Sequence, residues 1–173
     1  AVFVSNNLLS PAPRAVAFDI ADQLLRGSSP EAGKDWVRIV ADAANARKEE
    51  ASKGVAEADA ARAADSEPSL PLDAYAGTYR DPWYGDIEIT LQPDGSLYFQ
   101  SMRSDPLGGP LEHFQFDTFI ARWKDRGLNA DAYVSFTLSP EGTVERIRMK
   151  AVSKATDFSF DFHDLDLVRV AGE

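Results

Sequence analysis

The chain has 173 residues, 44% hydrophobic and 27% charged, with a formal net charge of −10 at pH 7. That composition is typical of a globular protein, no apolar run approaches the roughly 18 residues of a membrane span, and the negative charge argues against nucleic acid as a partner. The absence of cysteine excludes disulfides, a thiolate nucleophile and Cys-ligated metals, but leaves the compartment open.

The N-terminal segment is predicted to be a piece of a larger fold. Residues 1–4 form a short apolar run typical of a buried strand, with neither a starting Met nor a signal-peptide pattern. A helix is expected to follow from Pro11 or Pro13 and to end at Gly27. One strand and one helix cannot close a core. We therefore expect the exposed strand to pair with a sheet edge of its own barrel or of a second copy, which would give a homodimer.

Residues 28–70 are predicted to form a helical linker. Ser29 is the expected cap and Pro30 the first helical residue, and an apolar stripe follows. From 48 to 65 the sequence favours helix but has little to bury, so a solvated helix is expected there. Residues 66–71 are rich in Ser and Pro, and they are predicted to stop the helix and mark a domain boundary.

From Leu72 onward the pattern changes to the alternation of antiparallel strands. Residues 72–102 are predicted to form three strands, and turn signals continue at regular spacing to give about eight in all. An open sheet would leave its apolar face and two edges in water, so a closed or nearly closed barrel is expected. The alternation breaks at Val144 and again at Phe162, and each break predicts a β-bulge or a bend.

Several separated motifs in this part of the chain carry a family resemblance. They are LDAYAGTY at 72–79 with the turn at Tyr84 and Gly85, and GPLEH at 109–113 with FDTF at 116–119 and Trp123. Together they resemble a lipocalin-like domain of uncharacterised function found at the C-terminus of serine hydrolases of the β-lactamase and penicillin-binding-protein superfamily. The resemblance covers about 71–170. Upstream, residues 2–7 and 13–17 look like the last strand and closing helix of such a hydrolase domain.

The resemblance implies a division of the chain into three parts. Residues 1–27 would be the end of a class C-like hydrolase domain, 28–70 a helical linker, and 71–173 an eight-stranded antiparallel lipocalin-like barrel. The implied partner is the catalytic domain of the same parent chain, which would be periplasmic or secreted. No cofactor is implied.

The sequence lacks the residues that acyl transfer by such hydrolases requires. No Ser stands three residues before any of the lysines, and neither Lys-Thr-Gly nor His-Thr-Gly occurs. Ser5 to Asn7 matches the Ser-x-Asn element, but it lies in the expected N-terminal strand without partners. We therefore expect no enzyme activity from this chain and interpret it as an accessory domain that modulates substrate access or assembly. The alternative is a lipocalin-like module that binds a small apolar ligand.

Aromatic residues are the best candidates for binding. In small barrels they either fill the interior or surround a cavity, and the sequence leaves both readings open. The loop at 103–111 is a candidate for a barrel mouth, and Trp83 and Tyr84 are expected to be exposed on a turn where a partner domain could contact them. The candidate ligand-binding residues are Trp83, Tyr84, Tyr98, His113, Phe116 and Trp123.

No metal site is expected. His113 and His163 are the only histidines, are far apart in sequence, and belong to no short ligand motif. Four acidic residues near the C-terminus alternate with aromatic ones, and we interpret them as the solvated face of a half-buried strand: Asp157, Asp161, Asp164 and Asp166.

Overall fold

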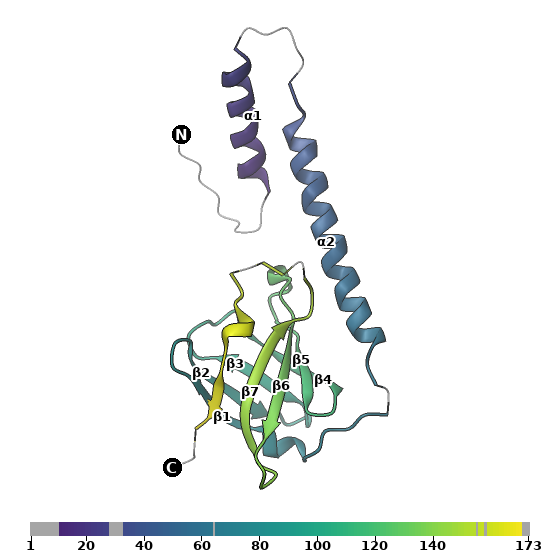
Figure 1. Ribbon diagram of the computed structural model, residues 1–173, viewed down its shortest axis with the longest axis vertical. Coiled ribbons are helices and arrows are strands. Elements are labelled where there is room, and N and C mark those ends of the chain that lie inside the picture. The colour runs from purple at the N-terminus through teal and green to yellow at the C-terminus, as the bar shows by residue number, and fades with distance from the viewer. Residues whose placement is uncertain (1–10, 28–32, 64, 155, 158, 171–173) are drawn as a thin grey trace. The chain divides into compact units, whose positions relative to one another are not determined.

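The structure is a computed structural model that describes residues 11–27, 33–63, 65–154, 156–157 and 159–170 (Figure 1). These residues fall into two units, Ala1–Glu50 and Ala51–Glu173. The expected strand at 1–4 lies outside the described residues, as do Ser29 and Pro30. Pairing of that strand and a homodimer formed through it therefore stay predictions. Among the described helices, none is both long and apolar enough to cross a membrane.

Helix α1, Ala12–Arg26, follows the sequence prediction closely. It has proline in its first turn and ends at Gly27, whose φ of 55° lies in the region that glycine tolerates best. Within the same unit the ring of Phe18 packs on that of Trp36 with centroids 5.0 Å apart. The Asp22 carboxylate accepts a hydrogen bond from the Arg26 side chain at 3.1 Å.

Helix α2, Trp36–Ala60, begins later than the sequence pattern predicts. Residues 33–35 are not helical, so the expected start at Pro30 is wrong. The Asp35 carboxylate accepts the backbone N–H of Arg38 at 2.9 Å and so takes the capping role that was expected of Ser29. An aspartate directly before the first apolar residue competes effectively with an earlier Ser-Pro pair.

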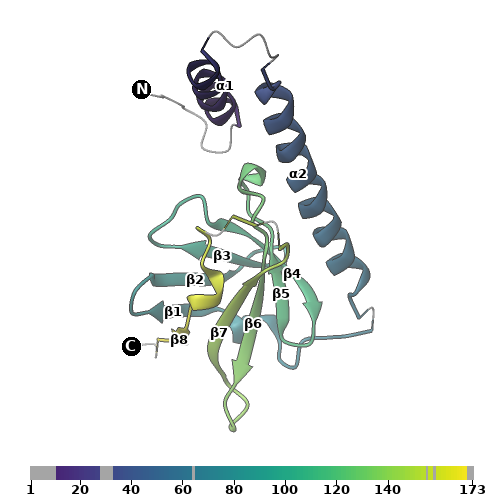
Figure 2. The ribbon, with the colours of Figure 1, turned by 45° about the horizontal axis from the view of Figure 1, so that its top comes forward.

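The remainder of the described chain is an antiparallel barrel, which confirms the predicted fold class (Figures 1 and 2). Each strand pairs with its neighbours in sequence, and β1 pairs with β8 to close the barrel. Within the described residues the strands are β1 Gly77–Asp81, β2 Gly85–Leu91, β3 Leu97–Ser101, β4 Gly108–Gln115, β5 Thr118–Ala121, β6 Ala132–Leu138, β7 Val144–Ala151 and β8 Leu167–Arg169. Three 3₁₀ turns accompany them: η1 Leu72–Tyr75, η2 Arg126–Leu128 and η3 Phe162–Asp164.

One of the two predicted interruptions is a β-bulge and the other is a turn. Leu138 pairs with Val144 and Thr137 with Arg146, which leaves Glu145 as the extra residue of a bulge. Phe162 instead begins η3, so the strand expected around 158–162 is wrong. The described residues between Val152 and Asp166 form a long connection at the barrel end, and the alternation of Phe160 and Phe162 in it does not reflect a strand.

One half of the barrel interior is filled by aromatic rings. Tyr75 and Phe136 have centroids 4.9 Å apart, and Phe119 packs edge-on against both. Tyr79 joins the cluster through Phe136 at 6.0 Å. The Tyr75 hydroxyl donates to Asp117 in the β4–β5 turn, and the Tyr79 hydroxyl donates to the Tyr75 carbonyl at 2.8 Å. Buried hydroxyls with partners make this half of the barrel a satisfied core.

The last turns of α2 belong to the barrel unit, so the solvated helix expected after 48 is only half right. Asp59 pairs with Arg122 at 2.6 Å, and Arg122 also holds Glu112 and the buried Asp131. A Cβ on Gly54 would come within 3.2 Å of Ser153, which shows how closely helix and barrel approach. Figures 1 and 2 show this end of α2 beside β4 and β5. Small residues such as Gly54 let this face of α2 pack closely on the barrel. The face therefore lacks the large apolar residues from which a buried helix is predicted.

Candidate ligand pocket at one end of the barrel

The up-and-down order of the strands brings distant segments together at one end of the barrel. Successive strands run in opposite directions, so every second connection lies at the same end. The connections that follow β1, β3, β5 and β7 therefore share an end, although they span 82–166 in the sequence. This end carries the pocket, and the aromatic core around Tyr75 occupies the other half.

The pocket has a volume of about 340 Å³ and apolar inner walls. Its floor consists of side chains that point inward from the strands: Ile87, Phe99, Met149 and Leu167. Trp123 closes one side and packs edge-on against Phe99 at 5.3 Å and stacks with Phe162 at 6.0 Å. The indole N–H of Trp123 donates to the Ala130 carbonyl at 2.6 Å, so the ring presents only its apolar surface to the pocket.

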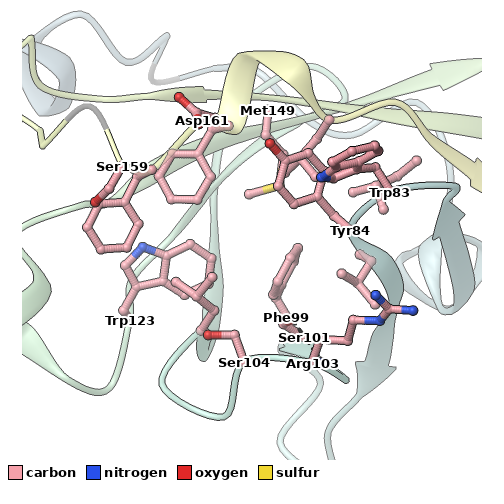
Figure 3. Close-up of a pocket in the computed structure, with 16 residues that line it drawn as sticks. Trp83, Tyr84, Phe99, Ser101, Arg103, Ser104, Trp123, Met149, Ser159 and Asp161 are labelled. Atoms are coloured by element: carbon pink, nitrogen blue, oxygen red, sulfur yellow. Dashed lines mark hydrogen bonds between the residues drawn. The ribbon is translucent and has the colours of Figure 1, made fainter.

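Trp83 and Tyr84 stand on the opposite side of the pocket from Trp123 (Figure 3). Both lie in the β1–β2 turn, where Trp83 is 81% exposed and Tyr84 39% exposed. Burial raises the pKa of the Tyr84 hydroxyl above its usual value. Nearby carboxylates raise it further, those of Asp161, Asp164 and Asp81. The pocket mouth beside Tyr84 is thus aromatic and negatively polarised.

Asp81, the last residue of β1, holds this turn in place. Its carboxylate is only 4% exposed and accepts the backbone N–H groups of Trp83 and Tyr84, each at 2.8 Å. It also accepts the N–H of Asp166 at 2.9 Å, which ties the turn to the segment before β8. Burial favours the neutral acid, but the three N–H donors outweigh it and lower the pKa of Asp81.

The β3–β4 loop supplies the third side of the mouth, as the sequence analysis anticipated for residues 103–111. Arg103, Ser104 and Leu107 line the pocket from this loop. A Cβ on Gly85 would come within 2.5 Å of Arg103 Nε, so the arginine lies flat against the β1–β2 turn. Residue 85 has a φ of 82°, a backbone conformation that glycine adopts without strain.

The structure brings three of the six candidate binding residues together. Trp83, Tyr84 and Trp123 line the pocket, whereas Tyr98, His113 and Phe116 do not. Tyr98 lies under the Lys124 ammonium, 4.8 Å from the ring centroid. The other two belong to the filled half, because His113 packs against Phe119 and its Nε2 donates a hydrogen bond to the Phe116 carbonyl. Phe116 itself is 64% exposed in the β4–β5 turn.

The residues that sequence reasoning missed come mainly from the segment before β8. Ser159, Asp161 and Leu165 line the pocket together with Phe160 and Phe162. A strand in this segment would have placed its acidic residues on a solvated face. The segment is not a strand, and Asp161 lies at the pocket mouth instead. Once the barrel topology is accepted, the rule that alternate connections share one end would have identified them.

His163 is the only histidine near the pocket mouth among the described residues. Its ring nitrogen and the carboxylates of Asp161 and Asp164 lie within 4.8 Å of one another. His113 does not belong to any comparable group of described His and acidic residues. All three side chains of the group are solvent-facing, and exposed acidic groups of this kind are common without a metal.

Comparison with known proteins places the chain in a family. A model for a domain of unknown function, DUF3471, matches residues 61–169, which is more than half of the chain. The chain belongs to the DUF3471 family. The DUF3471 match starts directly after α2 and takes in the entire barrel, with all four connections that form the pocket mouth.

Among curated proteins, the chain is similar to the unguisins hydrolase ungD of Aspergillus violaceofuscus. The two are 34% identical over 84 residues, which is 46% of this chain and 15% of the hydrolase. The DUF3471 chain thus corresponds to a small part of that relative.

Two solved structures are similar in shape. The C-terminal domain of penicillin binding protein Rv0907 gives a TM-score of 0.46 at 20% identity, covering 64% of this chain and 94% of that domain. SurE gives 0.43 at 20% identity, covering 61% of this chain and 20% of SurE. Both scores are below 0.5, and no conclusion about the DUF3471 chain rests on them.

Proposed function

We propose that this chain is a non-catalytic accessory domain of a β-lactamase-family serine hydrolase, and that its barrel modulates substrate access by holding an apolar group of the substrate. The observation that carries the proposal is the apolar pocket of about 340 Å³ at the open end of an otherwise filled barrel. Two further findings support it. The segment to which the chain is similar makes up only 15% of the length of the unguisins hydrolase ungD, and the sequence has no complete set of acyl-transfer motifs.

The size and lining of the pocket suit one ring or a short branched chain. Ligand sites for small molecules begin at about 300 Å³ and are mainly apolar with a few polar groups at the edge. Burying one aromatic or large aliphatic group yields about 1.5 to 3 kcal/mol. That free energy corresponds to weak binding, with a Kd of about 6 to 80 mM for a small ligand. Weak and reversible binding suits a domain that positions part of a substrate during turnover.

The second candidate is a carrier that retains a small apolar ligand in the manner of lipocalins. The apolar floor formed by Ile87, Phe99 and Leu167 favours it. The filled half of the barrel around Tyr75 and Phe136 opposes it, because it leaves little enclosed volume for a retained ligand. We therefore place substrate positioning first. Native mass spectrometry distinguishes a carrier from a substrate-positioning domain, because a carrier purified from cells should still hold its ligand.

A neutral probe tests the pocket. Titration with 2-phenylethanol, followed by tryptophan fluorescence and calorimetry, is expected to give saturable binding to the chain. Ser104→Trp places an indole in the half-buried loop that lines the pocket and is expected to abolish binding. Glu141→Trp, at an exposed turn of the opposite end, is the matched control and should bind as the wild type does. Equal binding by both variants would refute the pocket as the site.

A second experiment tests the non-catalytic role. The chain is incubated with nitrocefin and with a chromogenic ester, and neither is expected to be hydrolysed above the buffer rate. Hydrolysis that persists in a second, independently purified preparation would refute the proposal that this part of the protein is an accessory domain.

A further inference from the structure

We propose that the pocket selects apolar ligands that carry a primary ammonium group over equivalent ligands that carry a carboxylate. The inference deepens the proposed function and rests on it, because it names the chemical class of the group that the pocket would hold. It follows from the side chains at the mouth, which carry charges that the apolar floor lacks (Figure 3).

The first observation is the aromatic side of the mouth. Trp83 and Tyr84 both line the pocket, and the indole of Trp83 is 81% exposed although it adjoins an apolar cavity. The Asp81 hydrogen bonds hold the backbone of the turn from which both rings project. Tryptophan and tyrosine faces attract cations through their quadrupoles and bind ammonium groups in many sites. They offer no such attraction to a carboxylate.

The second observation is an acid at the same mouth. Asp161 lines the pocket, and no cation among the described residues pairs with its carboxylate. His163 is close by, but its ring pairs with Asp164 at 3.4 Å. The field of Asp161 and Asp164 reaches the Tyr84 hydroxyl, whose pKa both residues raise. An ammonium group placed between Tyr84 and Asp161 would therefore meet an aromatic face together with a carboxylate that forms no ion pair with a described residue.

Arg103 is the opposing charge, since among the described residues it is the one basic side chain in the pocket lining. The Arg103 guanidinium also has an acidic neighbour outside the pocket lining. It lies near Asp86 and helps to lower the pKa of that carboxyl, although hydrogen bonds from Arg80 at 2.6 and 2.8 Å are the main cause. The Arg103 charge is thus partly offset within the protein. The Asp161 charge has no comparable partner among the described residues.

The charge of the whole domain acts in the same direction. From residue 71 to the end the chain has 10 basic and 17 acidic residues. A surplus of this sign raises the local concentration of cations and lowers that of anions at low ionic strength. Added salt is therefore expected to reduce, but not to abolish, the selectivity for the amine, because the aromatic contact is not screened in the same way.

Three probes with the same ring and the same two-carbon spacer test the inference. They are 2-phenylethylamine, 3-phenylpropionate and the neutral 2-phenylethanol, each titrated at pH 7 against the wild-type chain. We expect the amine to bind about tenfold more tightly than the acid, with the alcohol between them. Asp161→Asn should reduce the ratio of amine to acid affinity by about threefold, and Arg103→Gln should increase it.

Glu141→Gln is the matched control, because it removes one negative charge from an exposed turn at the other end of the barrel. It should leave the ratio unchanged. If the alcohol binds but the amine binds no better than the acid, the inference is wrong and the proposed function stands. The inference also fails if Asp161→Asn and Glu141→Gln lower the ratio equally. If none of the three probes binds, the proposed function itself is refuted.

Discussion

Replacing Asp81 is the perturbation with the clearest expected effect on both fold and pocket. Its carboxylate accepts the N–H groups of Trp83, Tyr84 and Asp166 while being only 4% exposed itself. It lies where the barrel closes, and the described pairing there is short: Tyr79 pairs with Arg169 and Arg80 with Val168, and the Val170 N–H donates to the Thr78 carbonyl at 2.9 Å. The variant Asp81→Ala removes all three hydrogen bonds at the junction of β1 and β8.

The magnitude follows from the three donors. A hydrogen bond to a charged group contributes about 1.5 to 3 kcal/mol when buried, but the two N–H groups of the turn can bond to water once the carboxylate is gone. We therefore expect Asp81→Ala to lower the free energy of unfolding by about 3 kcal/mol. Asp81→Asn keeps one acceptor oxygen and should lose about 1.5 kcal/mol.

Urea unfolding followed by tryptophan fluorescence measures the loss. With a slope of about 1.5 kcal/mol per M, the Asp81→Ala variant should shift the midpoint by about 2 M. Asp94→Ala is the control, because Asp94 makes a similar contact, from the N–H of Ser96 at 2.9 Å, but in an exposed turn at the opposite end. It should lose less than about 1 kcal/mol. Equal losses in the two variants would refute the role assigned to Asp81.

The pH dependence gives an independent check. The pKa of Asp81 is lowered in the folded protein, so its contribution to stability is present above the unfolded pKa of about 3.9. It is lost as the pH falls through the folded pKa, because the folded state must then protonate the buried carboxylate. The difference in stability between wild type and Asp81→Asn should thus shrink below about pH 4. A constant difference down to pH 2 would contradict this reasoning.

Three further predictions concern the body of the barrel. Arg122→Ala removes the side chain that joins Asp59 of α2 to the barrel and should destabilise it by about 2 kcal/mol, measured by urea unfolding. Gly109→Ala would bring a Cβ within 2.1 Å of the Arg122 carbonyl oxygen and should cost more than about 3 kcal/mol by the same measure. Burial raises the pKa of Tyr79 to about 12, so stability should fall as the pH rises above the unfolded value of about 10, and Tyr79→Phe should reduce that fall in an alkaline titration.

Matched variants control these three measurements. Arg80→Ala removes a more exposed ion pair, with Asp86, and should lose less than about 1 kcal/mol. Gly95→Ala meets no neighbour within 4 Å and should cost only about 1 kcal/mol from its positive φ. Phe119→Leu alters a buried ring that has no hydroxyl and should leave the fall in stability above pH 10 unchanged. A control that matched its partner variant in effect would contradict the corresponding prediction.

The barrel was predictable because local signals in the sequence agreed with one another. Ile87 and Ile89 are buried while Glu88 between them is exposed, as the alternation required. The turn glycines Gly95 and Gly142 both have positive φ. The out-of-phase position of Val144 correctly predicted the β-bulge between β6 and β7. Patterns of period two and turn chemistry are local, and a fold built from neighbouring strands needs little else.

The errors arose where tertiary contacts decide the outcome. Gly54 and its small neighbours carry no apolar signal, yet this part of α2 lies closely against Ser153. Phe160 and Phe162 alternate like strand residues, but they stack on each other at 5.7 Å in a connection over the pocket. Neither arrangement can be read from spacing, because each depends on which segment lies opposite.

The pocket was anticipated only in part for the same reason. Residue type predicts Trp83, Trp123 and Phe116 alike as binding residues, but Phe116 is exposed in the β4–β5 turn and does not line the pocket. Residue type cannot say at which end of a barrel a connection lies. The order of the strands can, and the connections after β1, β3, β5 and β7 together define the mouth.

The central claim is that the end of the barrel between Trp83 and Trp123 receives an apolar group. Backbone amide chemical shifts of the isotope-labelled chain, recorded during titration with 2-phenylethanol, test it most directly. We predict saturable shifts that cluster in the β1–β2 turn, the loop at 103–107 and the segment at 159–167. Shifts that cluster instead around Tyr75 and Asp117 at the filled end, or that spread evenly without saturation, would contradict the claim.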